Sequence, residues 1–511
     1  MTTMNERPEA TGEEMAGGAQ ATARRTPGYA RALVERAARA YVAAHWDDVV
    51  DDIRTLVRVE STEDLPHATD QAPFGPGPRA AMDAALEVAA RLGFVTTHVE
   101  GAMGCADLPS ARAEAAGASD DPADQLGIIG HVDVVPAGPG WSVPAYDVTH
   151  REGYLMGRGV CDDKGPLVVA MHAACVVRDA LGALPRGVRV LVGTNEETGM
   201  ADVERYRARV ADPWFLFTPD AEFPVGYGEA GIMHGWVTSA PLAQDAAPAG
   251  QALISIEGGA AVNAVPGVAC AVVRAAEAPH AAEGIAVSPQ DVGRYLLEAQ
   301  GRAAHASTPE LGQSALARLL AYILDQGLCA PEQRPFLEFQ HCLACDHTGA
   351  AVGIDASDDD FGALTCVAGL ARTEGGRILQ SVDCRYPTST SGVRLAEAIS
   401  AGADRAGASF RLDDDRPPFL MEADSPEVRA LADAYSQVTD ARSEPFTMKG
   451  GTYARHFARG VSFGPEEPHV PRPAWVGSIH GPDEGIAEEL LQRSLVVYAL
   501  AIAALVELPA E

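Results

Sequence analysis

The chain has 511 residues, of which 47% are hydrophobic, and its 71 acidic and 39 basic side chains give a formal net charge of −32. This length and composition are typical of a folded protein with two or more domains and exclude intrinsic disorder. The negative charge would repel phosphate backbones, so we expect no nucleic-acid partner. Nine cysteines, an odd number in a long chain, argue against a disulfide framework and favour reduced thiols in the cytoplasm.

The N-terminal part is predicted to be a tail followed by two helices. Residues 1–27 are polar and lack the apolar core of a signal peptide, so we expect a flexible tail. Helical spacing of apolar residues predicts helices over 29–56 and 79–92, the second capped by Gly93. The segment 103–123, rich in Ala, Gly, Ser and Asp, is expected to be a loop. No run of about 18 apolar residues indicates a membrane span.

Short apolar runs then alternate with a helical segment. Residues 126–135, 188–197 and 214–217 are rich in β-branched or aromatic side chains, which favours buried strands. A helix is expected over 167–181, between the first two runs. This alternation predicts an α/β domain with a largely parallel sheet, whose ligands gather at the carboxyl ends of the strands.

After residue 231 the pattern changes, which indicates a second, α+β domain inserted into the first. Short strands are expected at 252–256, 269–273, 295–300 and 375–383, with one helix near 314–326. A further helix should begin at Ser425, because Ser is a good N-cap and Pro426 suits the first helical position. We therefore expect a first domain at 28–230 plus 424–511 and an inserted domain at 231–423.

Polar residues of one chemical kind follow the predicted strands. Close carboxylates would repel one another and raise each other's pKa values, and a divalent cation removes that penalty. Imidazole and carboxylate ligands suit zinc, manganese or cobalt, and several carboxylates can hold two ions about 3.5–4 Å apart. The residues of this predicted cluster are His131, Asp133, Asp162, Asp163, Glu196, Glu197 and Asp220, with His480 in the late motif SIHGPDE.

Two pairs within the cluster suggest divided roles. His131 and Asp133 lie two apart on a strand and face the same side, so Asp133 could accept the second imidazole proton. The alternative is two polar residues on a solvated strand face. Of Glu196 and Glu197, one could bind metal while the other takes a proton from a metal-activated water. The alternative is an acidic strand end that caps the next helix.

Four further segments carry candidate residues with simple alternatives. His305 in GRAAHASTPELG could be an ordinary surface histidine. Asn263 in VNAVPG and Arg385 in DCRYP could be turn and salt-bridge residues. The glycine turn of KGGTYARHF could hold a carboxylate through its backbone N–H groups.

Six motifs in order resemble the two-metal aminoacylase and carnosinase family of metallopeptidases, above all its peptidase V branch of bacterial dipeptidases. The motifs are GHVDVVPAG, GRGVCDDKGP, NEETG, TPDAEFP, AHASTPELG and HGPDE. The resemblance runs from about residue 41 to the C-terminus. It implies a zinc-peptidase-like three-layer α/β/α catalytic domain with an inserted α+β lid domain.

The resemblance also implies a site with two divalent ions per chain, with zinc favoured over manganese or cobalt. His131 and Asp220 would bind one ion, Glu197 and His480 the other, and Asp162 would bridge both through a loop with a cis bond to Asp163. The implied catalytic residues are Glu196 as general base, Asp133, which orients His131, and His305, which stabilises the oxyanion. The implied substrate-binding residues are Asn263, Arg385, Gly450, Gly451 and Thr452. The family pattern usually has asparagine where Asp483 stands, and the effect of Lys449 before the glycines is left open.

The implied activity is metal-dependent hydrolysis of unblocked dipeptides, with a small peptide as the partner molecule and a monomeric chain. An N-acyl amino-acid deacylase of acylornithine or succinyl-diaminopimelate type fits the same metal motifs. A third reading is a relic of a metal site used for binding alone. The retention of the five expected ligands together with Glu196 argues against that reading.

Overall fold

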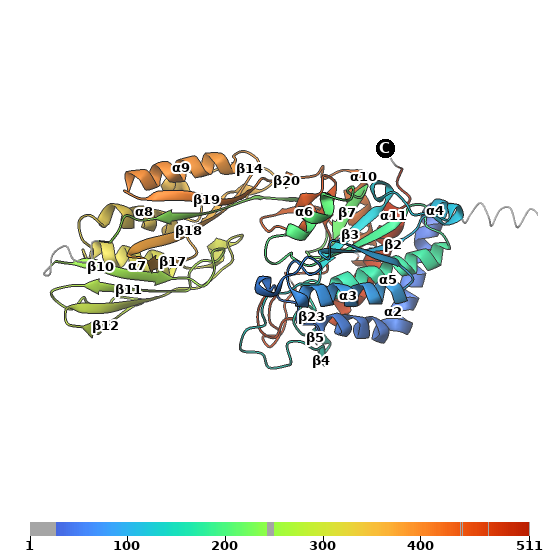
Figure 1. The fold of residues 1–511 in the computed structure, drawn as a ribbon, viewed down its shortest axis with the longest axis horizontal. Coiled ribbons are helices and arrows are strands. Elements are labelled where there is room, and N and C mark those ends of the chain that lie inside the picture. The colour runs from blue at the N-terminus through green and yellow to red at the C-terminus, as the bar shows by residue number, and fades with distance from the viewer. Residues whose placement is uncertain (1–26, 243–249, 440, 442, 469, 510–511) are drawn as a thin grey trace, which may run out of the picture. The chain divides into compact units, whose positions relative to one another are not determined.

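The computed structural model describes residues 27–509 except 243–249, 440, 442 and 469, and the chain divides into two compact units (Figure 1). Unit 1 contains the described chain up to Tyr227, then Met421–Phe446, and the chain from Thr452 onward. Unit 2 contains Gly228–Leu420 and the short segment Thr447–Gly451. The predicted tail, 1–27, lies outside the described residues except for Pro27. The roles of the two units as catalytic and lid domains stay a prediction.

Unit 1 is built on a twisted sheet with the order β1-β2-β6-β3-β7-β22. The four strands β6, β3, β7 and β22 pair in parallel, whereas β1 and β2 are antiparallel to their neighbours. The sheet therefore has a parallel centre, as predicted, with antiparallel strands on both sides, because β8 extends it beside β22 in antiparallel pairing. The bounds are β1 Val95–Val99, β2 Met103–Leu108, β3 Leu126–His131, β6 Val188–Gly193, β7 Phe215–Thr218 and β22 Gly460–Ser462.

Helices cover both faces of this sheet, because its strands alternate their side chains between two apolar cores. On β3, Ile128 packs into the larger core with the helices α2, α3, α5, α10 and α11, while Ile129 packs on the other face against α6 and η5. Figure 1 shows α2, α3 and α5 together on one side of the strands. The bounds are α2 Pro27–Val57, α3 Pro76–Arg91, α5 Lys164–Leu181, α6 Ala201–Arg207, α10 Pro426–Thr439, η5 Tyr453–His456 and α11 Glu488–Leu505.

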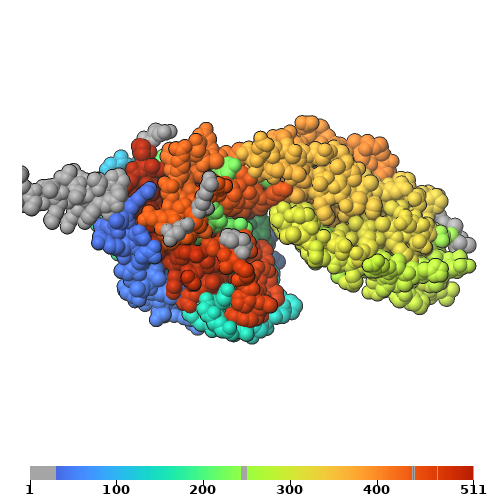
Figure 2. Space-filling view, turned by 180° about the vertical axis from the view of Figure 1, so that it is seen from behind, coloured from blue at the N-terminus to red at the C-terminus, as the bar shows by residue number. Residues whose placement is uncertain are grey.

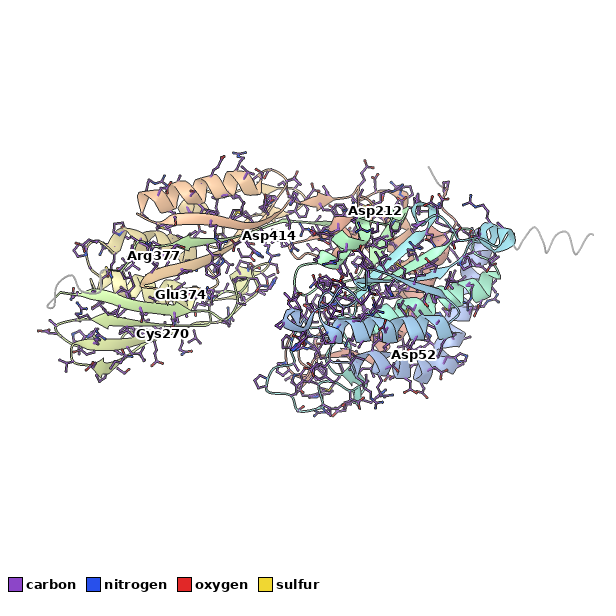
Figure 3. The ribbon with its side chains drawn as sticks, in the orientation of Figure 1. Asp52, Asp212, Cys270, Glu374, Arg377 and Asp414 are labelled. Carbon is purple, nitrogen blue, oxygen red and sulfur yellow. The ribbon has the colours of Figure 1, made fainter. Side chains whose placement is uncertain are left out.

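A buried polar network ties the helices of the larger core together. Asp52 on α2 (Figure 3) accepts a hydrogen bond from His172 Nε2 on α5 at 3.1 Å and pairs with Arg91 at the end of α3. The other ring nitrogen of His172 is 2.8 Å from the Tyr41 hydroxyl. Three helices are thus fixed to one another by side chains whose buried polar groups are satisfied.

The remaining parts of unit 1 are short elements around the sheet. Seen from behind, the teal segment near residue 150 lies against the red C-terminal part (Figure 2), where β23 pairs with β5. Met421 N–H donates to Tyr227 O at 2.8 Å, so the chain leaves and re-enters unit 1 at one point. The bounds are η1 Leu65–His67, α4 Ala111–Ala116, η2 Pro122–Asp124, β4 Thr149–Arg151, β5 Tyr154–Met156, β8 Gly226–Glu229, β21 Phe446–Met448 and β23 Gly485–Ala487.

Unit 2 is an antiparallel sheet with the order β12-β13-β11-β10-β17-β18-β9-β19, to which β16 adds beside β18, and with helices packed into its core. The strands are β9 Gly231–Thr238, β10 Ala252–Gly258, β11 Val268–Arg274, β12 Ile285–Asp291, β13 Arg294–Gln300, β16 Thr365–Val367, β17 Ala371–Glu374, β18 Arg377–Tyr386 and β19 Ser409–Arg416. The helices and minor elements are η3 Pro309–Leu311, α7 Ala315–Asp325, α8 Arg334–Cys345, η4 Ala350–Val352, α9 Gly392–Arg405, β14 Ser357–Asp358, β15 Gly362–Ala363 and β20 Phe419–Leu420.

Two sequence-based expectations about secondary structure are wrong. The segment 103–123 is not a loop, because it contains β2, α4 and η2. Its small residues mark close packing: a Cβ on Gly104 would meet Met82, Leu86 and Val192. The described residues of unit 2 also form three α-helices rather than the one predicted, the additional ones being α8 and α9. The helix predicted from Ser425 is confirmed, with the Ser425 hydroxyl accepting Val428 N–H at 3.3 Å.

Two further properties follow from the described residues. None of their helices combines the length and apolar character that a bilayer crossing requires. All nine cysteines are free thiols, including Cys342 and Cys345, which form a C-x-x-C pair on α8.

Candidate metal centre

The carboxyl ends of the parallel strands bring the predicted ligands of unit 1 together. His131 ends β3, Glu196 and Glu197 follow β6, and Asp220 follows β7. Asp162 and His480 come from loops outside the sheet. One ligand atom from each of His131, Glu196 and Asp220 lies within 4.8 Å of the others, and the same holds for His131, Asp162 and Glu197. The predicted cluster therefore forms from segments far apart in the sequence.

Asp162 lies between the two imidazoles. Its Oδ1 is 3.0 Å from His131 Nε2, and its Oδ2 is 2.9 Å from His480 Nε2. Asp220 Oδ2 lies 3.6 Å from His131 Nε2, and Glu197 Oε2 lies 3.1 Å from His480 Nε2. The five residues thus group as one histidine and one carboxylate on each side of a shared carboxylate. This is the grouping that the resemblance implied for two ions, and the assignment of ligands stays a prediction.

The electrostatics of the cluster fit a site that takes up positive charge. Burial, followed by the charge of Asp162, raises the pKa of Asp220 to about 7. Burial and the charge of Asp220 raise the pKa of Glu196 well above its usual range. Hydrogen bonds to Asp162 and Glu197 raise the pKa of His480 to about 11. The ionised form of Asp220 and Glu196 is therefore disfavoured by burial and by neighbouring negative charge, and a divalent ion would relieve that penalty.

Two buried carboxylates hold the loop that carries the glutamate pair. Asp133 accepts the backbone N–H groups of Glu196 and Glu197, each at 3.1 Å. Asp202 Oδ2 accepts Thr194 N–H at 2.7 Å and the hydroxyl of Tyr453 at 2.5 Å. The loop after β6 is therefore fixed by hydrogen bonds to its backbone, which leaves the glutamate side chains available for chemistry.

Asp133 also contacts His131, but through a different atom than expected. The Nδ1 of His131 is 3.0 Å from the backbone oxygen of Asp133 and 3.5 Å from its Oδ1. The backbone carbonyl can only accept a hydrogen bond, so Nδ1 carries the proton and Nε2 is left to face Asp162. If Asp133 orients the ring of His131, as predicted, it does so mainly through its backbone oxygen.

The loop that carries Asp162 needs its glycines. The Asp162–Asp163 bond is cis, as the resemblance implied. Gly159 has a φ of +88°, and a Cβ on Gly130 would collide with Asp163 Oδ2. That carboxylate oxygen accepts the backbone N–H of His131 at 3.1 Å, so the loop lies directly against the end of β3. The two neighbouring aspartates of GRGVCDDKGP therefore have different partners: Asp162 faces the His131 ring, and Asp163 accepts the His131 backbone N–H.

His480 lies in a turn with unusual backbone angles. His480 and Asp483 both have positive φ, +61° and +57°. Asparagine and aspartate tolerate this region better than other side chains with a Cβ, which explains why Asp483 can replace the usual asparagine. Asp483 Oδ1 accepts Ser142 N–H at 2.7 Å. Asp483 is therefore compatible with the positive φ of this position and accepts a hydrogen bond from the Ser142 backbone.

In unit 2, two candidate residues lie side by side. A β-bridge joins Ala264 to His305, and Asn263 O accepts Ala306 N–H at 2.9 Å. The Nδ1 of His305 accepts Ser307 N–H at 3.2 Å. A backbone N–H can only donate, so neutral His305 carries its proton on Nε2. That nitrogen is then a hydrogen-bond donor, as the predicted oxyanion role requires.

Arg385 and the glycine turn meet within the same unit. The Arg385 guanidinium forms two hydrogen bonds with Asp383, at 2.8 and 3.0 Å, and its Nη1 donates to Lys449 O at 3.3 Å. Lys449 precedes Gly450 and Gly451, which belong to unit 2, whereas Thr452 belongs to unit 1 and accepts Ala454 N–H. A substrate role for these residues stays a prediction.

Several residues that support the cluster are not among the residues predicted from the sequence, among them Asp202, Tyr453 and Lys164. Lys164 is buried, its Nζ donates to Val59 O at 2.8 Å, and burial lowers its pKa to about 7. One signal could have identified it: the chain has only two lysines among its 39 basic residues, Lys164 and Lys449. A compact ammonium retained in an arginine-rich chain indicates a constrained position.

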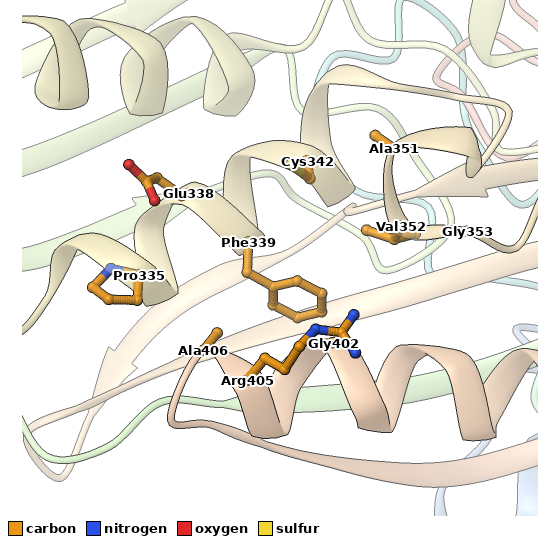
Figure 4. A pocket seen from close by; sticks show the side chains of 10 residues that line it. All are labelled: Pro335, Glu338, Phe339, Cys342, Ala351, Val352, Gly353, Gly402, Arg405 and Ala406. Atoms are coloured by element: carbon orange, nitrogen blue, oxygen red, sulfur yellow. The ribbon is translucent and has the colours of Figure 1, made fainter.

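A sizeable cavity of unit 2, about 510 Å³, contains none of the candidate residues (Figure 4). It lies between α8, η4 and α9 and is lined by Phe339, Cys342, Val352, Gly402 and Arg405. Its described lining residues include one carboxylate, Glu338, and no histidine.

Comparisons with known proteins agree with this arrangement. Residues 127–504 match the family described as Peptidase family M20/M25/M40. "Putative dipeptidase SH1171" of Staphylococcus haemolyticus is 33% identical over 433 residues, which cover 81% of this chain and 89% of the relative. "Putative dipeptidase SAB1611c" of Staphylococcus aureus is 31% identical over 438 residues, which cover 83% of this chain and 90% of the relative.

Solved structures with the same fold share little sequence with the chain. Human carnosine dipeptidase 1 matches with a TM-score of 0.56 and 14% identity, over 93% of this chain and 99% of that one. The di-peptidase Dug1p of Saccharomyces cerevisiae matches with a TM-score of 0.56 and 12% identity, over the same shares. These likenesses concern the fold alone, and they confirm the predicted α/β architecture with an inserted α+β domain.

Proposed function

Since the chain belongs to peptidase family M20/M25/M40, we propose that it is a metal-dependent dipeptidase that hydrolyses the amide bond of unblocked dipeptides. The observation that carries this proposal is Asp162, whose two oxygens lie within 3.0 Å of His131 and His480, with Glu197 and Asp220 beside them. The relatives named as dipeptidases, which the chain matches over most of their length, support this substrate class.

The donor set fits two divalent ions. Two imidazoles and three carboxylates, with no thiolate among them, suit zinc and also accept manganese or cobalt. The ligands would be His131, Asp220, Glu197 and His480, with Asp162 shared. When bound, such ions supply Lewis acidity toward the substrate carbonyl and lower the pKa of a water molecule.

Glu196 would perform the proton transfers. Its side chain lies beside His131 and Asp220, within reach of a water molecule bound between the ligands, which is the position that a general base requires. Glu196 accepts a proton from the attacking water and then returns it to the leaving amine. Asp133 contributes by fixing the Glu196 backbone and the ring of His131.

Residues of unit 2 would bind and polarise the substrate. His305 would donate its Nε2 proton to the oxyanion of the tetrahedral intermediate. Arg385, held by Asp383, would bind substrate together with Asn263. The turn at Gly450, Gly451 and Thr452 would hold the free carboxylate of the dipeptide. Unit 2 is then a lid whose closure excludes bulk water.

We also propose a monomeric, cytoplasmic enzyme, on the basis of its free thiols and its own complete set of candidate residues.

A substrate panel tests the dipeptidase proposal. The zinc-loaded protein is incubated with unblocked dipeptides and, separately, with N-acetyl and N-succinyl amino acids. We expect release of free amino acids from the unblocked dipeptides only. Cleavage of the blocked compounds alone would identify an N-acyl amino-acid deacylase instead, and the absence of both reactions would support a binding relic.

A further inference from the structure

A buried ion pair joins the two loops of unit 1 that carry Asp162 and His480. Glu484 lies four residues after His480, and Arg158 lies four residues before Asp162. Both side chains are almost completely buried, with exposed fractions of 0% for Glu484 and 1% for Arg158. Their charges meet at 2.5 Å between Arg158 Nη1 and Glu484 Oε2.

The second oxygen of Glu484 binds the backbone of the loop before Asp162. Its Oε1 accepts N–H groups from Gly159 at 3.0 Å, Cys161 at 3.1 Å and Asp162 itself at 3.3 Å. A carboxylate that accepts several backbone N–H groups in this way fixes the conformation of the loop that donates them. The backbone of Asp162 is therefore held by a side chain from the other loop.

The contacts also run in the opposite direction. Arg158 Nη2 donates to Gly481 O at 3.2 Å, next to His480, and Gly157 N–H donates to Glu484 O at 3.0 Å. β23, which begins directly after Glu484, pairs with β5, which ends directly before Gly157. Each loop thus supplies one charged side chain that binds the backbone of the other.

We propose that Glu484, neutralised by Arg158, is a positioning residue for both metal positions, because it fixes the backbone of Asp162 relative to the backbone of His480. This inference rests on the proposed two-metal function. Buried ion pairs contribute little net stability compared with apolar packing, so their retention at this place fits a geometric role. Loss of a residue that orients a metal ligand typically weakens metal affinity 10–100-fold.

The test is the affinity of the metal-free protein for Zn²⁺, measured by equilibrium dialysis at buffered free Zn²⁺ with elemental analysis. Glu484→Gln keeps the shape of the side chain but cannot accept at both ends. The control is Asp107→Asn, which weakens a partly buried pair in unit 1, Asp107 with Arg189, joining β2 to β6 without contact to the cluster. We expect E484Q to bind both Zn²⁺ ions about 10–100-fold more weakly and D107N to bind them as the wild type does.

The melting temperature of the metal-free variants separates stability from positioning. A purely structural pair predicts that E484Q lowers the melting temperature but binds Zn²⁺ as tightly as D107N and the wild type do, and that result would overturn the inference. If E484Q does not fold, R158K replaces it, because the lysine keeps the charge but cannot contact Glu484 and Gly481 together. Weaker Zn²⁺ binding by R158K supports the inference, and unchanged binding overturns it. A wild type that takes up no Zn²⁺ would instead refute the proposed function itself.

Discussion

Replacing Glu196 with glutamine tests the assignment of the general base. The substitution keeps the volume of the side chain and its backbone contacts with Asp133, but removes the ability to accept a proton. Positioned general bases contribute about 10²–10⁴-fold in rate. We therefore expect kcat on an unblocked dipeptide to fall by that factor, which corresponds to about 3–5 kcal/mol of transition-state stabilisation.

The metal content of the variant is the decisive second measurement. Glu196 offers an oxygen within 4.8 Å of ligand atoms of His131 and Asp220, so it could itself be a ligand. A base leaves the Zn²⁺ content of Glu196→Gln equal to that of the wild type, whereas a ligand lowers it. Exposed Glu204 on α6 provides the control, since Glu204→Gln should change neither property. A variant that keeps near-normal turnover, or that loses Zn²⁺, would show that the role assigned to Glu196 is wrong.

The remaining predictions concern pH, the His480 turn and a helix cap. The pKa of Asp220 is raised to about 7 in the metal-free folded protein. Between about pH 4 and pH 7 the folded chain therefore binds a proton at Asp220 more tightly than the unfolded chain does. The free energy of unfolding of the metal-free protein should accordingly decrease as pH rises through this range. Because Zn²⁺ replaces that proton, the rise in melting temperature on adding Zn²⁺ should grow between pH 5 and pH 8, and an equal rise at both would contradict the argument. Asp483→Asn should leave the free energy of unfolding within about 0.5 kcal/mol of the wild-type value. Asp483→Ala should lower it by about 1–2 kcal/mol, because alanine tolerates the positive φ poorly. Equal free energies of unfolding for the two variants, measured with urea, would refute this explanation. Ser425→Ala removes the N-cap of α10 and should lower the free energy of unfolding by about 1 kcal/mol, and no change would show that the cap is dispensable.

The centre of the site could be predicted because the end of a buried strand is marked in the sequence by the point where an apolar run stops. Apolar runs that stop at His131, at Glu196 and at Asp220 mark the carboxyl edge of a parallel sheet, and the structure brings these side chains within reach of one another. His480 follows no strand, and only the HGPDE motif pointed to it. The predicted grouping of the ligands around Asp162 therefore depended on the family resemblance as much as on periodicity.

The supporting residues could not be predicted in the same way. Glu484 acts by accepting three backbone N–H groups from a turn, and the conformation of that turn leaves no periodic pattern in the sequence. Asp202 and Tyr453 meet although they are 251 positions apart. Such contacts become visible only when the fold has placed distant segments side by side.

Two of the errors in secondary structure, at β2 and at α9, share a physical origin. Small residues favour the prediction of a loop, but in β2 they allow α3 to approach the sheet closely, as at Gly104. In α9 a core-facing stripe of Leu395, Ile399 and Ala403 repeats every four residues within an Ala- and Gly-rich segment. Glycine and alanine can therefore indicate tight contact between elements as well as a break in the chain.

The hydrogen bond between Tyr227 and Met421 has a consequence for the modularity of the protein. An insertion of nearly two hundred residues that starts and finishes at adjacent backbone positions leaves β1, β2, β3, β6, β7 and β22 of its host uninterrupted. Such a junction lets unit 2, the proposed substrate-binding part, be lengthened, shortened or exchanged without rebuilding the proposed metal centre. The five residues Thr447–Gly451 also belong to unit 2, although the chain on both sides of them belongs to unit 1. An exchange of unit 2 between proteins would therefore have to include this segment.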